Sequence, residues 1–483
     1  MATEVYYPSL YTSAPSYGNK YLSYCYGDLS CALAFLSLLV VANMASTSSN
    51  ALRSLSFKFS LLTTWLLWWT LCTTALPTSN VPRQDEDSHW VATWTSMPQL
   101  VEPNNMPPSP FSGSAAFKDA TLRQTLHLSI GAERLRFQIS NTFGGSDLPI
   151  TEASVALPTG GKTGVNGIDT ATLKGLTFNG SSSVTIPKGQ VAYTDPIDFK
   201  VDPQGTITVS LYSQPGQSGS SITGHPGSRT TSWMQQGNHL NASIVTGAST
   251  AHWYFLTAVE AWAPKTTGAL VILGDSITDG RGSTDNANNR WPDLLLARMQ
   301  KEGITNIAVC NQAAGGNTVL TGGLGPPLMQ RYKRDLLTTA GVKYALIFEG
   351  VNDIGGASTD SGTQTRIGSS LTSSFKTIAT DAKAAGLTVF GATITPFGGS
   401  GQSYSNPTRD QTRQTVNKWI LGGGDGSFEA SIDFAKFVAN PSNAANLASQ
   451  YDGGDHLHPN GAGYQAIADQ FPLDIFKGNA TAV

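Results

Sequence analysis

An apolar run without polar alternation, Ala269–Leu273, is the feature of this 483-residue chain that most constrains its fold. Such a run is typical of a strand buried on both faces, as in a parallel sheet. Gly274, Asp275 and Ser276 follow and predict a tight turn at the strand's carboxyl end. Ligands of open α/β sheets bind at this edge, so Ser276 is a candidate nucleophile. Because a serine hydroxyl alone is a weak nucleophile, the chain must also supply a base, an orienting group and oxyanion donors.

The segment 265–483 alternates short apolar strands with helical patterns. The predicted strands are Ala269–Leu273, Asn306–Cys310, Tyr344–Glu349 and Leu387–Thr393. The predicted helices are Pro292–Glu302, Leu328–Thr339, Gly368–Ala385, Thr408–Leu421 and Gly461–Phe471. This alternation predicts βαβ units, a mostly parallel sheet and helices on both of its faces.

The segment 88–264 carries short period-two runs that turn residues separate. The runs are Leu122–Ile130, Arg134–Ser140, Ser154–Leu157, Ser183–Ile186, Thr206–Tyr212 and Trp253–Val259. We expect an antiparallel β-sandwich of jelly-roll type, in which the first two runs form a hairpin across residues 131–133. The tryptophans of this segment either pack in the interior, which is the commoner role, or line a sugar-binding surface: Trp90, Trp94, Trp233, Trp253 and Trp262.

Residues 1–83 do not resemble a folded domain. Basic residues precede the apolar stretch Phe59–Leu76 and small residues follow it, a pattern typical of a secretory signal peptide. Met44 would then be the start, with an upstream extension before it. The alternative is a membrane anchor, because this stretch approaches the roughly 20 residues that span a bilayer. We expect a secreted, extracellular protein without a stable membrane partner.

Composition narrows the partners and the compartment. Charged residues are 13% of the chain and the net charge is −3, which gives no electrostatic basis for binding nucleic acid. Beyond the leader, which holds Cys25, Cys31 and Cys72, only Cys310 remains, so the folded part has no disulfide framework and Cys310 should be a small buried side chain. Sequons for N-glycosylation suit a secreted chain and lie at Asn179, Asn241 and Asn479.

Four short clusters follow the predicted strands or occupy loops of the segment 265–483. They are Gly274–Ile277, Asn311–Asn317, Gly350–Asp353 and Asp455–Pro459. In a parallel sheet the first three clusters meet at one edge, and a loop must bring the fourth to them.

A chemical role can be assigned to one or two residues of each cluster. His458 would accept the proton of Ser276 and later give it to the leaving group. Asp455 would hold the imidazole tautomer and stabilise the imidazolium. Donors for the oxyanion would be the backbone N–H groups of Ser276 and Gly316 and the side-chain amide of Asn352.

The four clusters, in this order, resemble the blocks of the SGNH hydrolases, also called the GDSL esterase/lipase family. The resemblance implies a three-layer α/β/α domain that hydrolyses acyl esters through a serine, with no metal or other cofactor. The preceding sandwich is similar to the N-terminal module of some two-domain secreted members. Ile277 replaces the usual Leu of the first block. The Ser, Gly, Asn and His that name the family are here Ser276, Gly316, Asn352 and His458.

Two of these positions have competitors. Gly315 competes with Gly316, which we choose by its spacing within the second block. His456 competes with His458, which the family's Asp-x-x-His-Pro spacing selects. Asp455 and both histidines could instead bind a metal, but no further ligand set is evident in the sequence.

We expect a serine esterase that hydrolyses acyl esters, in particular acetyl esters, on carbohydrate. Loops rich in Gly, Ser and Asn favour a polar ester over a lipid: Gly280–Asn289, Gly315–Pro327 and Gly398–Asn406. The alternatives are a lipase that acts on lipid esters and a glycan-binding protein without catalytic activity.

Overall fold

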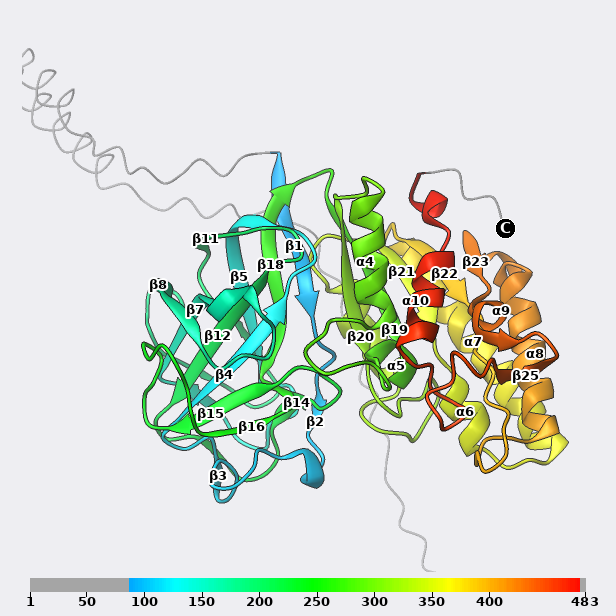
Figure 1. Ribbon diagram of the computed structural model, residues 1–483, viewed down its shortest axis with the longest axis horizontal. Helices are drawn as coiled ribbons and strands as arrows, with labels where there is room; N and C mark the ends of the chain where they lie inside the picture. The colour runs from blue at the N-terminus through cyan, green and yellow to red at the C-terminus, as the bar shows by residue number, and fades with distance from the viewer. Residues whose placement is uncertain (1–86, 478–483) are drawn as a thin grey trace, which may run out of the picture. The chain divides into compact units, whose positions relative to one another are not determined.

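The structure, a computed structural model, describes residues 87–477. The first part of this range forms antiparallel sheets and the second part a parallel sheet (Figure 1). The predicted leader with its three cysteines and Asn479 lie outside these residues. Within residues 87–477, no helix is long and apolar enough to cross a membrane. Both parts belong to one compact unit, and a domain boundary near residue 265 stays a prediction.

Among residues 87–264, two antiparallel sheets contain most of the strands. One sheet runs in the order β1 (Ser88–Thr95), β18 (Leu256–Pro264), β5 (Ala132–Ser140) and β10 (Val191–Tyr193), with β11 (Ile197–Val201) also paired to β5. The other runs in the order β16 (Ala248–Thr250), β15 (Ser232–Gln236), β4 (Ala120–His127), β12 (Thr206–Ser213), β7 (Glu152–Pro158) and β8 (Ile168–Leu176). Shorter elements complete this part: β2 (Gln99–Leu100), η1 (Pro103–Asn105), β3 (Ala115–Ala116), β6 (Leu148–Ile150), η2 (Thr159–Gly161), β9 (Val184–Ile186), β13 (Gln217–Ser218), β14 (Thr223–His225) and β17 (Trp253–Tyr254). The predicted antiparallel, strand-rich character of this part is confirmed.

The predicted hairpin between residues 122–130 and 134–140 is wrong. β4 pairs with β12 and β15 in one sheet, whereas β5 pairs with β18 in the other. The chain crosses between the sheets at Gly131, where a Cβ atom would lie 2.8 Å from the ring of Pro203. Period-two alternation identifies the buried face of a strand, but it does not identify the strand's partner.

The tryptophans of this part pack against other groups. Trp94 and Trp253 are buried and meet edge to face, with 4.8 Å between ring centroids. Trp90 and Trp262 form a similar pair at 5.2 Å. Trp233 donates its ring N–H to a backbone carbonyl. None of these rings lines the cavity at Ser276, and their observed contacts are packing contacts.

The second part is built on a parallel sheet. Its order is β20 (Ile307–Ala313), β19 (Gly268–Gly274), β21 (Val342–Phe348), β22 (Thr388–Ala392) and β23 (Ala430–Ile432). The helical elements are α3 (Ser276–Asp279), α4 (Trp291–Lys301), α5 (Leu328–Tyr332), the π-helical turn η3 (Lys333–Leu337), α6 (Val351–Gly356), α7 (Ser361–Ala384), α8 (Pro407–Leu421), η4 (Gly424–Gly426), α9 (Phe434–Val438), α10 (Gly461–Gln470) and η5 (Leu473–Lys477). A short antiparallel pair, β24 (Ala439–Asn440) and β25 (Asn443–Leu447), follows α9. The α/β prediction is confirmed, and β23 is an addition too short to show a pattern in the sequence.

The strand order explains why helices cover both faces of this sheet. The connection from β19 to β20 through α4 moves one way along the sheet, whereas the connections through α7 and α8 move the other way. Because parallel crossovers are right-handed, α4 lies on one face beside α10, and α7 and α8 lie on the other (Figure 1). Trp291 of α4 is fully buried and packs against Phe348 and Phe434.

The first part covers the edge of the parallel sheet at β20. Ser129 Oγ donates to the Val309 carbonyl at 2.8 Å and accepts from the Val309 N–H at 3.2 Å. Thr95 Oγ1 donates to the Asn311 carbonyl at 3.1 Å. Cys310, fully buried as predicted, contacts a carbonyl of β1. These contacts satisfy backbone groups that an open edge would leave unpaired.

Candidate active site

Ser276 lies at the carboxyl edge of the parallel sheet. β19 ends at Gly274, and α3 begins at Ser276 itself. Asp275 caps this short helix, because its side chain accepts a hydrogen bond from the Ile277 N–H at 3.0 Å. The turn leaves the Ser276 side chain at the wall of a cavity while the residue is 6% exposed.

A chain of hydrogen bonds joins Ser276, His458 and Asp455. Ser276 Oγ lies 2.8 Å from His458 Nε2, and His458 Nδ1 lies 2.7 Å from Asp455 Oδ2. Since a carboxylate only accepts, Nδ1 carries a proton, and Nε2 of the neutral ring is the acceptor for the serine hydroxyl. The other carboxylate oxygen accepts from the N–H groups of Leu457 and His458 at 3.0 and 2.8 Å, which fixes the loop.

The pKa values of this pair suit an ionised carboxylate beside a neutral imidazole. Burial alone would raise the pKa of Asp455, but the hydrogen bonds from His458 and Leu457 and the imidazole charge lower it to about 2. Burial lowers the pKa of His458 below its usual 6.5, and the bond to Asp455 opposes this only in part. His458 is therefore neutral at neutral pH and free to accept a proton.

His456 binds a different partner. Its Nδ1 lies 2.5 Å from Asp452 Oδ2, and its backbone N–H donates to Asp452 Oδ1 at 3.0 Å. The structure therefore brings His458, and not His456, to Ser276. Across the described range 87–477, no three His, Cys, Asp or Glu side chains are grouped so that they could hold a metal ion.

The backbone N–H groups of Ser276 and Gly316 have no hydrogen-bond partner among the described residues. Gly316 has a φ of +68°, a left-handed conformation that favours glycine. Both Gly315 and Gly316 line the cavity beside Ser276. Unpaired donors at a cavity wall are what an oxyanion requires.

Asn352 is held in one orientation by two contacts. Its Nδ2 donates to the Asn317 carbonyl at 2.7 Å, which places Oδ1 where it accepts from the Tyr404 hydroxyl at 3.1 Å. Tyr404 approaches closely because Gly355 has no side chain: a Cβ there would lie 2.1 Å from the ring. The second hydrogen of Nδ2 has no acceptor in the part of the chain that the structure describes, and Asn352 lines the same cavity.

The cavity at Ser276 has a volume of about 540 Å³, and both parts of the chain line it. The α/β part supplies the predicted site residues together with Tyr404, Arg281 and Leu324. The first part supplies a mostly polar wall that includes Gln99, Glu102, Asn105, Pro226, Arg229 and His252. The sequence did not indicate this wall, because its residues lie far from Ser276 in the chain.

Arg331 ties together the loops that carry the first three clusters. It is 1% exposed, and its guanidinium donates to Gly274 O at 3.1 Å, to Asn317 Oδ1 at 2.9 Å and to Glu349 Oε2 at 3.1 Å. It also binds Gln312 O and Asp335 Oδ2. The sequence carried a signal for this role. In the helical pattern of residues 328–339, Arg331 and Asp335 lie on the same face as the apolar positions Leu328, Tyr332 and Leu336.

Other carboxyl groups lie buried behind Ser276. Asp353 accepts from the N–H groups of Val319 and Leu320, both at 2.9 Å, and so holds the second cluster's loop against the third. Burial raises the pKa of Asp353 to about 6, that of Asp275 to about 7 and that of Glu349 to about 8. Arg331 opposes the rise at Asp275 and Glu349, so its charge is an essential part of this buried group.

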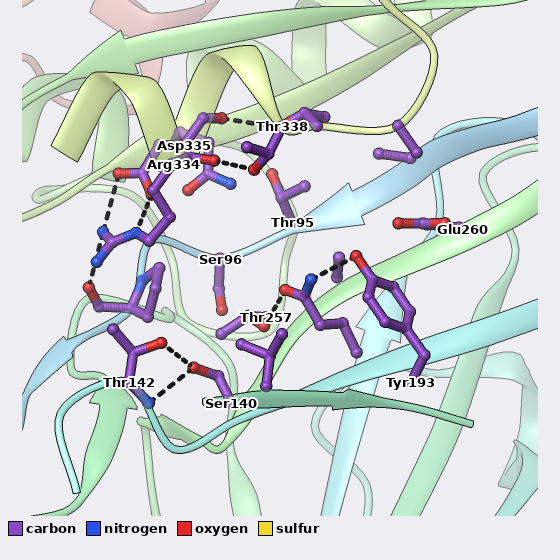
Figure 2. A pocket seen from close by; sticks show the side chains of 18 residues that line it. Thr95, Ser96, Ser140, Thr142, Tyr193, Thr257, Glu260, Arg334, Asp335 and Thr338 are labelled. Carbon is purple, nitrogen blue, oxygen red and sulfur yellow. Dashed lines mark hydrogen bonds and ion pairs between the residues drawn. The ribbon is translucent and has the colours of Figure 1, made fainter. Parts of the chain in front are cut away.

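Another cavity, of about 130 Å³, lies between the first part and η3 (Figure 2). It contains none of the predicted site residues. Its polar groups bind one another: Thr257 donates to Gln138, Gln138 donates to Tyr193, and Ser140 bonds to Thr142. We therefore place the candidate chemistry in the larger cavity at Ser276.

Replacing Arg331 with methionine should lower the free energy of unfolding by about 3–5 kcal/mol, because it leaves buried acidic groups without their cation. Urea denaturation of the full chain measures this, with Arg366→Met on the exposed side of α7 as the control. Arg331→Lys keeps the charge but offers fewer donors, so the stability of this variant should lie between those of the wild type and of Arg331→Met. Equal unfolding midpoints for R331M and R366M would contradict the role given to Arg331.

Comparisons with known proteins agree with the position of the four clusters. The profile of the GDSL-like Lipase/Acylhydrolase family matches residues 272–466. Among curated proteins, no relative matches the chain. All four clusters fall in the matched stretch, and so do Ser276, Gly316, Asn352 and His458.

Similar solved structures include three with related descriptions. A GDSL-like lipase from Bacteroides thetaiotaomicron is 15% identical over 44% of this chain and 88% of that chain, with a TM-score of 0.33. A lipase/acylhydrolase from Enterococcus faecalis is 19% identical over 44% and 96%, with a TM-score of 0.33. The acetyl xylan esterase AlAXEase is 16% identical over 44% and 99%, with a TM-score of 0.31. On the profile match, residues 272–466 of this chain form a GDSL-like lipase/acylhydrolase (SGNH) domain.

Proposed function

We propose that this protein is a serine esterase that hydrolyses acyl esters through an acyl-enzyme on Ser276. The observation that carries the proposal is the unbroken line of hydrogen bonds from Ser276 Oγ through His458 to Asp455, at 2.8 and 2.7 Å. Free N–H donors lie at the same cavity wall. A nucleophile, a base with its orienting group and preorganised donors are the parts that acyl transfer needs.

In the first half-reaction, Ser276 Oγ attacks the ester carbonyl carbon while His458 Nε2 takes the hydroxyl proton. The carbonyl oxygen becomes an oxyanion, which the N–H groups of Ser276 and Gly316 and the amide of Asn352 stabilise. The carbon–oxygen bond to the alcohol then breaks, and the imidazolium of His458 gives its proton to the leaving oxygen. Asp455 stabilises the imidazolium between these transfers.

In the second half-reaction, water replaces the alcohol. His458 takes a proton from the water as its oxygen attacks the acyl carbon, and the same donors hold the second oxyanion. The bond to Ser276 Oγ breaks, His458 returns the proton to the serine, and the carboxylic acid leaves. Every proton is accounted for by His458, so the proposed reaction uses no cofactor.

We propose a short acyl group, acetyl in particular, on a polar alcohol such as a carbohydrate. The cavity wall supports this choice, because the first part contributes Gln99, Glu102, Asn105 and His252 to it. A long acyl chain binds favourably only where a large contiguous apolar surface can remove it from water. Apolar side chains at the wall, such as Leu324 and Leu457, are interspersed with polar ones.

The ester panel that tests this proposal measures kcat/KM on 4-nitrophenyl esters from acetate to palmitate. The wild type should prefer the shortest chains, and Ser276→Ala should lose roughly 10⁴–10⁶-fold in kcat. Ser369→Ala, on the exposed side of α7, is the matched control. Preference for the longest chains would favour a lipase, and glycan binding without turnover in the wild type would favour the non-catalytic alternative.

The pH profile of kcat/KM should have an acidic limb with its midpoint below pH 6.5. His458 must be neutral to act as the base, and burial lowers its pKa from 6.5. The activity is therefore at its full value at neutral pH, and it is lost as the pH falls through the lowered pKa of His458. Initial rates between acidic and neutral pH measure it, and a limb centred above pH 7 would rule out His458 as described.

We also propose that the protein is secreted as a glycoprotein with a catalytic domain at residues 265–483 after a sandwich domain at 88–264. Asn179 and Asn241 are exposed and therefore accessible to glycosylation. Sequencing the N-terminus of protein from the culture medium should give a start between Leu76 and Asp85. A protein that stays with the membrane fraction and keeps Phe59–Leu76 would be tethered instead.

A further inference from the structure

Two arginines line the cavity at Ser276, one from each part of the chain. Arg229 lies in the loop after β14, and Arg281 lies just after α3. Both guanidinium charges lower the pKa of His458, which is consistent with their position near its ring. The cavity wall therefore carries two guanidinium groups near the ring of His458.

Arg229 is held in an uncommon conformation with donors to spare. Its φ is +50°, in the left-handed region that residues with a side chain seldom adopt. The Asn286 N–H donates to its carbonyl at 2.8 Å and holds the backbone there. Its Nε is buried without a hydrogen-bond partner in residues 87–477, and Nη1 forms a long ion pair with Asp285 at 3.9 Å. Backbone strain of this kind is concentrated at binding and catalytic sites.

Arg281 is anchored by its backbone, with its side chain exposed. The Tyr464 hydroxyl donates to the Arg281 carbonyl. The Arg281 guanidinium has no hydrogen bond or ion pair with any residue that the structure describes. Its donors therefore remain available to a ligand.

The carboxylates of the cavity wall already have partners. The pairs are Asp455 with His458, Asp279 with His225, and Glu102 with Gln99 and Asn105. His225 Nδ1 lies 3.0 Å from the Met97 carbonyl and its Nε2 lies 2.9 Å from Asp279 Oδ1, so the buried imidazole engages the Asp279 side chain. Each of these carboxylates thus has a hydrogen-bond partner, whereas the Arg281 guanidinium and the Arg229 Nε have none among the described residues.

We propose that Arg229 and Arg281 form an anion subsite, and that the substrate is an ester of a glycan that carries carboxylate groups, such as a polyuronic acid. This inference rests on the proposed esterase function and names its substrate class. A guanidinium binds a carboxylate through parallel N–H bonds and retains its charge at every relevant pH. Two such groups would place a sugar acid beside Ser276 while its ester reaches the oxyanion donors.

The test compares kcat/KM on acetylated oligogalacturonides and on acetylated xylooligosaccharides, which are neutral, at low and high salt. The wild type should favour the acidic substrate at low salt, and salt should reduce that preference because it screens the charges. Arg229→Gln and Arg281→Gln should each lower the acidic-over-neutral ratio by about tenfold, the loss of one charge-assisted hydrogen bond. Arg366→Gln, at an exposed position of α7 that does not line the cavity, is the matched control and should keep the wild-type ratio.

Two results would overturn the subsite. One is a wild type that favours the neutral substrate at low salt. The other is an equal loss on both substrates in the arginine variants, with equal shifts of the acidic pH limb, because the arginines would then act only through His458.

Failure of the esterase function itself gives a different result, namely no turnover of any ester. In that case, calorimetry with Ser276→Ala compares binding of plain oligogalacturonate with binding of plain xylooligosaccharide. Tighter binding of the acidic oligosaccharide, weakened by Arg229→Gln, supports the subsite alone. Equal or absent binding of both contradicts it.

Discussion

The buried guanidinium of Arg331 is the interaction on which the candidate site most depends. All five of its N–H groups have acceptors. Four of these acceptors lie at the ends of three neighbouring strands or in the loops that follow, and the other, Asp335, lies in η3. Gly274 precedes Ser276, Asn317 follows Gly316, and Glu349 precedes the loop of Asn352. A planar group with fixed bond directions therefore sets the spacing between the nucleophile and the oxyanion donors, while no part of it lines the cavity.

The first part of the chain contributes to the site as well as to the fold. It covers the edge of β20 and satisfies backbone groups there. It also builds one wall of the cavity, including Arg229 and His252, and joins the other part through the buried pair of His225 and Asp279. A parallel sheet provides the carboxyl edge where Ser276 lies, and the antiparallel part narrows what can reach it.

Local pattern predicted most strands of the parallel sheet, and it indicated the loops that carry the candidate site residues. The apolar runs predicted the strands of the parallel sheet up to β22, and Ser276, Asp455 and His458 meet because each lies at a strand end or in a loop. Contacts between distant segments were not predictable from such patterns. The hairpin proposed across residues 131–133 was wrong, since alternation does not choose a partner. Arg229 gave no signal at all, because its conformation and unpaired donors exist only in the folded chain.

Covalent labelling tests the central claim, an activated Ser276, most directly. The full-length protein is treated with diethyl 4-nitrophenyl phosphate, which phosphorylates activated serines, and the modified peptide is identified by tandem mass spectrometry. The account predicts stoichiometric diethylphosphorylation of Ser276, in step with loss of esterase activity and much slower in His458→Ala. Label on another residue, or activity lost with Ser276 unmodified, would contradict it.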